Sequence, residues 1–434
     1  MWFLYEFLYV IGFVLYLPRA LWRRRFPHRG WVMRLGRYPK ALLQRLGGRQ
    51  TLWVHAVSVG EVLAVLPLVE ALGRADPDDP IVLSTITPGG FEVASRRLGE
   101  RASVVYFPLD LSGCVARAFD QLRPRLLMLV ESELWPTVIR TAHARGVPVA
   151  VVNGRISART VRRYRWVGPW QTGMLRRVDA FLMQSQEDAD RLLRLGAPAD
   201  HVQVVGSLKW DASLSARPTA EAIGALAARI GCNGRQAVVV AGSTHRGEER
   251  VILDAFQHLC DTHPNLRLII APRHLERLTE VEALIRHAGY RSVRLSALGQ
   301  GAAWDVGVVD SFGQLPVYYG LATVVFIGGS LIPHGGQNPL EAASLGKPVL
   351  FGPSMHNFSV ISHQLLAHHA ACQVSGPADL ASLIGELLDQ PQQAAEMGRR
   401  AQALTEQFQG ATVRTLEALR PLLKGAVRWP DGYG

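Results

Sequence analysis

Short apolar runs alternate with amphipathic, helix-like stretches along most of this 434-residue chain. The first series of such segments extends from the apolar run at residues 51–57 to the run at residues 201–206. Strands that alternate with helices in this way are typical of a parallel β-sheet covered by helices. The pattern therefore predicts a Rossmann-like α/β domain over residues 23–212.

A second series of the same kind follows after a break. Residues 213–235 lack a buried-strand pattern and contain Pro218, so we expect a linker and a surface helix there. Strand-like and helix-like segments then resume, which predicts a second Rossmann-like domain over residues 236–424. The chain is also longer than one hydrophobic core usually organises. We expect the fold class α/β, with two Rossmann-like domains.

The N-terminal segment differs from the rest of the chain. Residues 1–22 are almost wholly apolar or aromatic and are followed by a basic run that begins at Arg23. About 20 apolar residues span a bilayer as a helix, and Glu6 lies inside this segment, so a spanning helix and an interfacial helix both stay open. We expect a membrane anchor that contacts anionic lipids, with the body of the protein in the cytoplasm. Basic residues after the apolar run argue against a cleaved signal.

Cysteine spacing and charge narrow the class of protein. The 4 cysteines lie far apart without a CxxC pair, so neither a zinc site nor a disulfide framework is indicated. The net charge of +11 suits nucleic acid, anionic lipid or a phosphorylated substrate. Nucleic acid is the least favoured of these partners, because no DNA- or RNA-binding motif accompanies the charge.

A carboxylate follows the first strand of the first domain. Glu61 comes directly after the apolar run 51–57, at the predicted start of a helix. Ligands of open α/β sheets bind at the carboxyl ends of strands, where Glu61 would act as a base. A helix start favours an ionised carboxylate by about 0.3–1 kcal/mol, so we expect Glu61 to be deprotonated. Ser58 and Glu61 also fit a capping box, and by spacing alone the cap is the favoured role.

Further charged groups follow later strands of this domain. Glu131 and Glu133 come after the apolar run 125–130. Glu131, nearest the strand end, is the better candidate for the ligand-binding cleft, whereas Glu133 could be a solvated acid of the next helix. Lys209 follows the last strand. The intervening cations are Arg155, Arg159, Arg162, Arg163 and Arg165. Cations at strand ends suit a phosphorylated ligand, although a basic run is more often a solvated face.

The second domain carries anion-binding chemistry at its strand ends. Residues 242–246, GSTHR, and the dipeptide Pro272–Arg273 each follow a strand. A glycine-rich turn, Gly335–Gly336, leads to Asn338, Pro339, Leu340 and Glu341 at a predicted helix start over residues 338–346. Backbone amides there would hold phosphate, and Glu341 would hold ribose hydroxyls or be a first-turn acid.

Eight segments in this order resemble the Kdo (3-deoxy-D-manno-octulosonic acid) transferase family. They are SVGE (58–61), STITPGGFEVA (84–94), ESELWP (131–136), NGRIS (153–157), GSLKWD (206–211), AGSTHRGEE (241–249), APRH (271–274) and GGQNPLEAASLGKPV (335–349). The resemblance implies an inverting glycosyltransferase of GT-B architecture. It would move Kdo from CMP-Kdo to a lipid A precursor, lipid IVA, at the cytoplasmic face of the inner membrane, during lipopolysaccharide core biosynthesis.

The resemblance also implies roles for individual residues. Glu61 matches the general base, and Glu131 and Lys209 match positions that stabilise the transition state. The positions that match the CMP-binding segments are Pro272, Arg273, Phe312, Gly313, Gln314, Asn338, Pro339, Leu340 and Glu341. Many relatives carry an acid where Gln314 lies, so its contact with CMP would run through the backbone.

We expect no cofactor and no metal. A monophosphate leaving group carries less charge than a diphosphate, and the chain has no carboxylate pair with convincing metal-site spacing. The alternatives are another GT-B transferase or a nucleotide-sugar epimerase with a diphosphate donor, or a non-catalytic membrane adaptor. The adaptor leaves Glu61 and Lys209 without a role.

Overall fold

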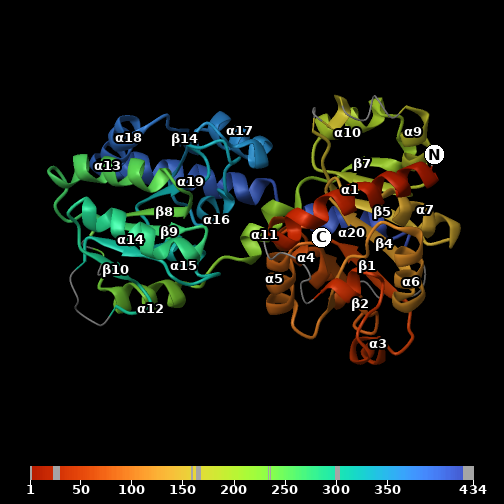
Figure 1. Ribbon diagram of the computed structural model, residues 1–434. Coiled ribbons are helices and arrows are strands. Elements are labelled where there is room, and N and C mark those ends of the chain that lie inside the picture. Colours follow the sequence, from red (N-terminus) through yellow and green to blue (C-terminus); the bar gives the residue numbers. More distant parts are fainter. Residues whose placement is uncertain are drawn as a thin grey trace. The chain divides into compact units, whose positions relative to one another are not determined.

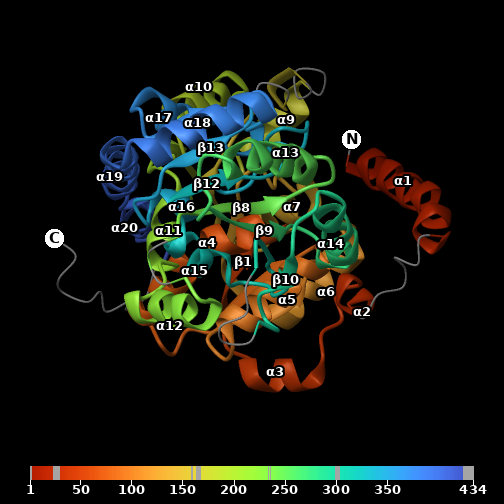
Figure 2. The same cartoon turned by 90° about the vertical axis from the view of Figure 1, so that its left-hand side faces the viewer.

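The computed structural model of the chain describes residues 2–22, 30–157, 160–162, 168–232, 234, 236–298 and 304–423. It divides into two compact units (Figure 1). The first unit comprises Met1–Ala212 together with Gln409–Gly434, and the second comprises Ser213–Phe408. Each unit contains its own parallel sheet of seven strands. Figure 2 shows the helices around the sheet of the second unit.

The sheet of the first unit has the strand order β3-β2-β1-β4-β5-β6-β7. Its strands are β1 Thr51–His55, β2 Ile81–Thr85, β3 Ser103–Tyr106, β4 Pro124–Val130, β5 Val149–Gly154, β6 Ala180–Met183 and β7 Val202–Val204. Successive residues of β1 enter different cores: Trp53 packs on one face of the sheet, and Leu52 and Val54 pack on the other. Strands that are buried on both faces explain why the sequence shows apolar runs here.

Helices cover both faces of this sheet. The helices of this part of the chain are α1 Trp2–Trp22, α2 Trp31–Arg34, α3 Lys40–Leu46, α4 Val59–Ala75, α5 Pro88–Leu98, α6 Ser112–Leu122, α7 Pro136–Ala144, α9 Pro169–Leu175, α10 Gln186–Arg194, η1 Ala199–His201, α11 Leu208–Ser215 and α20 Ala411–Leu419. The chain runs outward from β1 to β3 and then returns to β4 beside β1. The strand order therefore reverses between β1 and β4, and open α/β sheets bind ligands at such a point.

The second unit repeats this plan with the strand order β10-β11-β9-β8-β12-β13-β14. Its strands are β8 Val238–Thr244, β9 Arg267–Pro272, β10 Ser292–Arg294, β11 Val306–Val308, β12 Val324–Ile327, β13 Val349–Phe351 and β14 Ala371–Gln373. Its helices are α12 Ala220–Ile230, α13 Glu248–Cys260, η2 Leu275–Arg277, α14 Leu278–His287, α15 Leu315–Leu321, α16 Leu340–Ala343, η3 His356–Phe358, α17 Ser359–Ala367, α18 Pro377–Asp389 and α19 Pro391–Gln407. Here the order reverses between β8 and β12.

The end of the chain belongs to the first unit, so the predicted second domain over residues 236–424 is too long. Helix α20 lies among the elements of the first unit, as its blue ribbon shows in Figure 1. Leu416 and Leu419 join the core beneath α4. The Asp211 carboxylate accepts hydrogen bonds from the backbone N–H groups of Gly410 (2.8 Å) and Thr412 (2.6 Å). These contacts fasten the returning segment to the first unit.

Residues 213–235, predicted as a linker and a surface helix, contain helix α12 and are part of the second unit. The side chains of Leu226 and Ile230 on α12 are buried. The Ile230 carbonyl also accepts a hydrogen bond from the indole Nε1 of the buried Trp304, at 2.9 Å. Since an amphipathic helix buries one face against its own unit, this segment is not a free connection.

Helix α1 coincides with the predicted anchor and contacts the first unit. The Tyr5 hydroxyl donates to the Asp110 carboxylate at 2.7 Å, and Glu6 pairs with Arg140 at 3.0 Å. Phe13 stacks on Trp31 with ring centroids 5.6 Å apart. Within the described ranges, no helix combines the length and the apolar character that crossing a membrane requires.

Candidate functional site

Glu61 lies at the start of α4, immediately beyond β1. One carboxylate oxygen accepts the Val57 N–H at 2.8 Å, and the other accepts the Ser58 hydroxyl at 2.9 Å. The Ser58 hydroxyl oxygen in turn accepts the Glu61 N–H at 3.4 Å, so Ser58 caps the helix. The capping role is therefore present, although the Glu61 carboxylate returns to Val57 and not to the Ser58 amide.

The protonation state of Glu61 differs from the expectation that a helix start keeps it ionised. Burial, and then the charge of Glu131, raise the pKa of Glu61 to about 8, with a smaller contribution from Glu133. A helix start contributes about 0.3–1 kcal/mol, which moves a pKa by less than one. Burial beside other carboxylates moves a pKa by several pH units. The effect of burial on the pKa of Glu61 therefore exceeds that of the helix dipole, and the carboxyl is mostly protonated at neutral pH.

Glu131 forms an ion pair with Lys209 directly after β4. The Lys209 Nζ lies 2.8 Å from the Glu131 Oε1, and both side chains are largely shielded from solvent. Glu131 has a backbone φ of 59°, in the left-handed region. A residue other than glycine costs on the order of 1–3 kcal/mol in such a conformation, and such residues gather at active sites. Because β4 adjoins β1, the pair lies at the reversal point of the sheet, where Glu61 also lies.

Glu133 is not a solvated acid of the following helix. Helix α7 begins at Pro136, three positions later. Burial, and to a lesser degree the charge of Glu131, raise the pKa of Glu133 to about 7. The site therefore gathers three carboxyl groups, from two neighbouring strand ends, and one lysine.

Asn153 holds the backbone next to Lys209, a contact that the sequence did not predict. Its side-chain oxygen accepts the Leu208 N–H at 3.0 Å, at the start of α11. Asn153 is completely buried and has a φ of 53°, a left-handed conformation that asparagine tolerates better than most residues. The arginine of the segment NGRIS, Arg155, suggested a ligand contact, whereas the asparagine of the segment makes this one. An asparagine at a strand end, followed by glycine, was the available signal.

The structure describes two of the five predicted arginines of this region. Arg155 is half-buried and Arg162 is exposed. The predicted cations Arg159, Arg163 and Arg165 lie outside the described residues.

In the second unit, imidazoles gather where β8 and β12 end. The His245 ring lies 4.0 Å from the His334 ring and 5.6 Å from the His274 ring, measured between centroids. Burial, followed by His334 and His274, lowers the pKa of His245 to about 4. Its Nε2 lies 3.2 Å from the Gln337 amide nitrogen, which is a hydrogen bond if that imidazole nitrogen accepts. A neutral His245 therefore lies among polar side chains at this end of the sheet.

The predicted donor-binding residues occupy the same edge of this sheet. Pro272 ends β9, and the Arg273 N–H donates to the Thr244 carbonyl at 2.9 Å, beside β8. Phe312 is 58% exposed, and Gly313 has a φ of 79°. Gln314 caps α15 through its carbonyl, which accepts the Val317 N–H at 3.0 Å, and its side chain makes no capping hydrogen bond.

The segment at residues 338–341 forms a shorter helix than expected. Helix α16 comprises Leu340–Ala343 alone, and the Asn338 side-chain oxygen accepts the Leu340 N–H at 3.1 Å. Leu340 is completely buried, so its side chain packs in the core and only its backbone is available to a ligand. Pro339 is buried as well, whereas Asn338 and Glu341 are half-buried. In the described ranges, no three histidine, cysteine or acidic side chains are grouped so that they could hold a metal ion.

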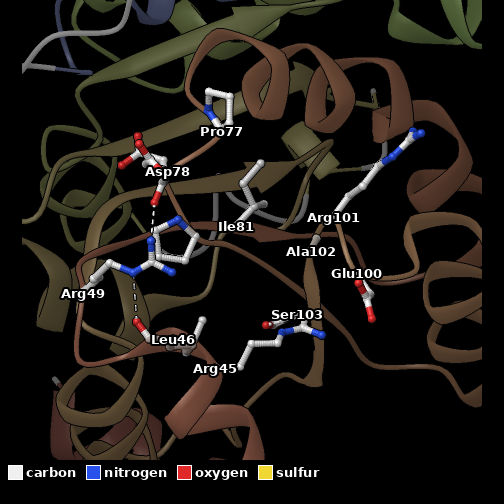
Figure 3. A pocket seen from close by; sticks show the side chains of 12 residues that line it. Arg45, Leu46, Arg49, Pro77, Asp78, Ile81, Glu100, Arg101, Ala102 and Ser103 are labelled. Atoms are coloured by element: carbon white, nitrogen blue, oxygen red, sulfur yellow. Dashed lines mark hydrogen bonds between the residues drawn. The ribbon is translucent and has the colours of Figure 1, made fainter.

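A separate hollow lies at the other edge of the first sheet, where β2 and β3 begin (Figure 3). Arg45 donates to the Ser103 hydroxyl at 2.8 Å, and Arg49 donates to the Asp78 carbonyl at 2.8 Å. Since the candidate site lies at the carboxyl ends of the strands, this hollow does not belong to it.

The chain is thus an α/β protein of two doubly wound units, and each unit carries polar groups where its strand order reverses. Among solved structures, a glycosyltransferase from Rickettsia africae shares this fold with a TM-score of 0.60 at 12% identity, and the match covers 87% of this chain and 100% of that chain. The profile of the family "3-Deoxy-D-manno-octulosonic-acid transferase (kdotransferase)" matches residues 29–212.

Two curated relatives match nearly the whole length. The 3-deoxy-D-manno-octulosonic acid transferase of Haemophilus influenzae is 31% identical, over 89% of this chain and 92% of its own length. The transferase of the same name from Bordetella pertussis is 35% identical, over 86% of this chain and 87% of its own. The chain belongs to the family of 3-deoxy-D-manno-octulosonic acid (Kdo) transferases, and it is therefore a glycosyltransferase.

Proposed function

We propose that this enzyme transfers Kdo from CMP-Kdo to the lipid A precursor lipid IVA, with inversion at the anomeric carbon, and that its two units form a GT-B architecture. The observation that carries the proposal is Glu61, a carboxyl group with a pKa of about 8 beside the Glu131–Lys209 ion pair. Family membership favours the transferase over an epimerase or a membrane adaptor.

Glu61 would act as the general base. A sugar hydroxyl becomes a good nucleophile when a carboxylate within about 3 Å accepts its proton. A base works best when its pKa lies near the working pH, because it must be ionised and still hold the proton. Burial and the neighbouring carboxylates place the pKa of Glu61 in that range. Its partners Val57 and Ser58 hold the carboxylate in place before the acceptor binds.

Lys209 would stabilise the charge that develops during transfer. Its ammonium group is paired with Glu131 at 2.8 Å in a largely shielded setting, where a fixed cation acts more strongly than in water. Asn153 holds the start of the helix that carries it.

The donor nucleotide would bind to the second unit. Arg273 offers a guanidinium group for the phosphate, and Gln314, where many relatives carry an acid, would contact CMP through its backbone. Asn338 and Glu341 would bind through side chains, and Pro339 and Leu340 through backbone atoms. Pro272, Phe312 and Gly313 complete the proposed CMP site.

Purified protein incubated with CMP-Kdo and lipid IVA tests this function by the mass of the product. We expect Glu61→Gln to abolish transfer and to leave CMP binding, measured by calorimetry, unchanged. Normal transfer by this variant would exclude Glu61 as the base.

Transfer would also proceed without a metal ion, because basic residues and backbone amides neutralise the single phosphate of CMP. We expect full activity after treatment with EDTA. Loss of activity in EDTA that magnesium restores would contradict this expectation.

Helix α1 would attach the enzyme to the cytoplasmic face of the inner membrane, where the acceptor's acyl chains reside. Tyr5, Tyr9 and Phe13 are half-buried and share one face of the helix. The exposed apolar side chains are Leu4, Phe7, Leu8, Val10, Ile11, Val14 and Leu15. An apolar face of this kind, beside a basic run, suits burial in an interface with anionic lipid.

Flotation with vesicles of phosphatidylethanolamine and phosphatidylglycerol tests the attachment. We expect the double substitution Leu8→Glu and Leu15→Glu to reduce binding by about tenfold or more, since each leucine contributes about 1.5–3 kcal/mol when buried. Val360→Glu, at an exposed position of α17, is the matched control and should float like the wild type. Equal flotation of all three proteins would refute the attachment through α1.

A further inference from the structure

A buried carboxylate connects two loops of the second unit. Glu248, the first residue of α13, is completely buried. Its carboxylate accepts four backbone N–H groups: those of His245 (2.9 Å), Gly329 (2.6 Å), Ser330 (3.0 Å) and Leu331 (3.0 Å). A buried charge is tolerated only when it is well hydrogen-bonded, and here backbone amides provide the bonds.

The two loops follow β8 and β12, which are neighbours in the sheet and flank its reversal point. His245 lies on the first loop, and Gly329 to Leu331 lie on the second. Gly329 has a φ of 69°, and an added Cβ there would lie 3.3 Å from the His245 ring and 3.4 Å from the His334 ring. The loops therefore pack closely, and their spacing depends on the carboxylate between them.

Hydrogen bonds connect the second loop to the proposed donor segment. The Gly336 N–H donates to the Gly329 carbonyl at 2.8 Å, and the Gln337 N–H donates to the Gly328 carbonyl at 3.0 Å. Asn338 follows directly. A shift of Gly329 would therefore move the backbone that presents Gln337 and Asn338.

We propose that Glu248 is a positioning residue of the donor site: its carboxylate holds the loops after β8 and β12 at the spacing that lets His245 and residues 337–341 bind the anionic nucleotide. The inference rests on the proposed function. Glu248 touches no substrate, because its side chain is buried and its partners are backbone amides.

Glu248→Gln tests the inference. Glutamine has the same size, but it offers one acceptor oxygen and sets an N–H₂ group against backbone N–H donors, so part of the amide cluster loses its partner. We expect the Kd for CMP and the KM for CMP-Kdo to rise about tenfold or more, with the acceptor KM unchanged.

Glu249→Gln is the matched control. Glu249 is equally buried and adjacent, but it binds Arg277 at 2.7 Å and the Thr244 hydroxyl at 3.0 Å. We expect a comparable loss of Tm and a donor KM within about twofold of the wild type. An equal rise in donor KM for both variants would overturn the positioning role, because a general loss of stability would then explain it.

Two further measurements keep the outcome decisive. If Glu248→Gln does not fold, Gly329→Ala displaces the same loop and should raise the Kd for CMP; wild-type affinity in either folded variant overturns the inference. If the wild type itself neither binds CMP nor transfers Kdo, the proposed function fails, and this inference fails with it.

Discussion

Replacing Glu61 with glutamine removes an ionisable group and keeps the size of the side chain. A difference between the wild type and this variant in how activity or stability changes with pH therefore reports the ionisation of Glu61. With a pKa of about 8, roughly one-tenth of Glu61 is ionised at pH 7. A general base acts in its ionised form. We therefore expect kcat/KM for CMP-Kdo, with the acceptor held constant, to rise about tenfold per pH unit below 8 and to level off above it.

The same shift predicts how stability changes with pH. The pKa of Glu61 rises on folding from the ordinary 4.5 to about 8. Glu61 therefore stabilises the fold most fully below pH 4.5. This contribution is lost as the pH rises from 4.5 through 8, because the unfolded chain releases the proton in that range while the folded state still holds it. Between pH 6 and pH 9, the loss amounts to about 2–3 kcal/mol.

Thermal unfolding of both proteins at these two pH values measures the difference. Glu61→Gln cannot ionise, so its Tm relative to that of the wild type should increase from pH 6 to pH 9 by a few degrees. A constant difference in Tm, together with a flat activity profile between these values, would refute the raised pKa and with it the reasoning for Glu61 as a base.

Two other substitutions test the surroundings of Glu61. Lys209→Met should lower kcat about 100-fold, because the fixed cation is lost, and should leave the Kd for CMP within about twofold; single-turnover rates and calorimetry measure the two effects, and a kcat near that of the wild type would exclude Lys209 from charge stabilisation. Asn153→Ala should lower kcat several-fold and cost about 1 kcal/mol, because alanine tolerates the left-handed φ poorly and the Leu208 amide loses its acceptor. Asn153→Asp keeps an acceptor and should recover part of kcat; equal kcat in both variants would mean that Asn153 does not position Lys209.

The sequence predicted the two sheets because strands that are buried on both faces leave uninterrupted apolar runs, as β4 and β8 do. It did not predict the place of α20. An amphipathic helix such as α20 shows that one face is buried but not which unit buries it. The contact of Asp211 with Gly410 joins residues almost 200 positions apart, and no local pattern encodes it.

For the candidate site too, the sequence predicted the local features and missed the long-range ones. Strand-end placement predicted Glu61, Glu131 and Lys209, because the carboxyl ends of parallel strands meet at one edge. The prediction that Glu61 is deprotonated was wrong, because its pKa depends on burial and on the charge of Glu131, which follows another strand. The local helix start was visible in the sequence, and the stronger long-range effects were not.

The return of α20 to the first unit affects how the protein is made. The second unit is one continuous stretch, Ser213–Phe408, and the ribosome can release it as a finished folding unit. The first unit begins before it but lacks α20 until residues 411–419 emerge, and α20 packs against α4, whose first turn contains Glu61. Synthesis of the first unit therefore starts before that of the second unit and is completed after it. An incomplete chain that ends near residue 408 would contain the whole second unit and an unfinished first unit.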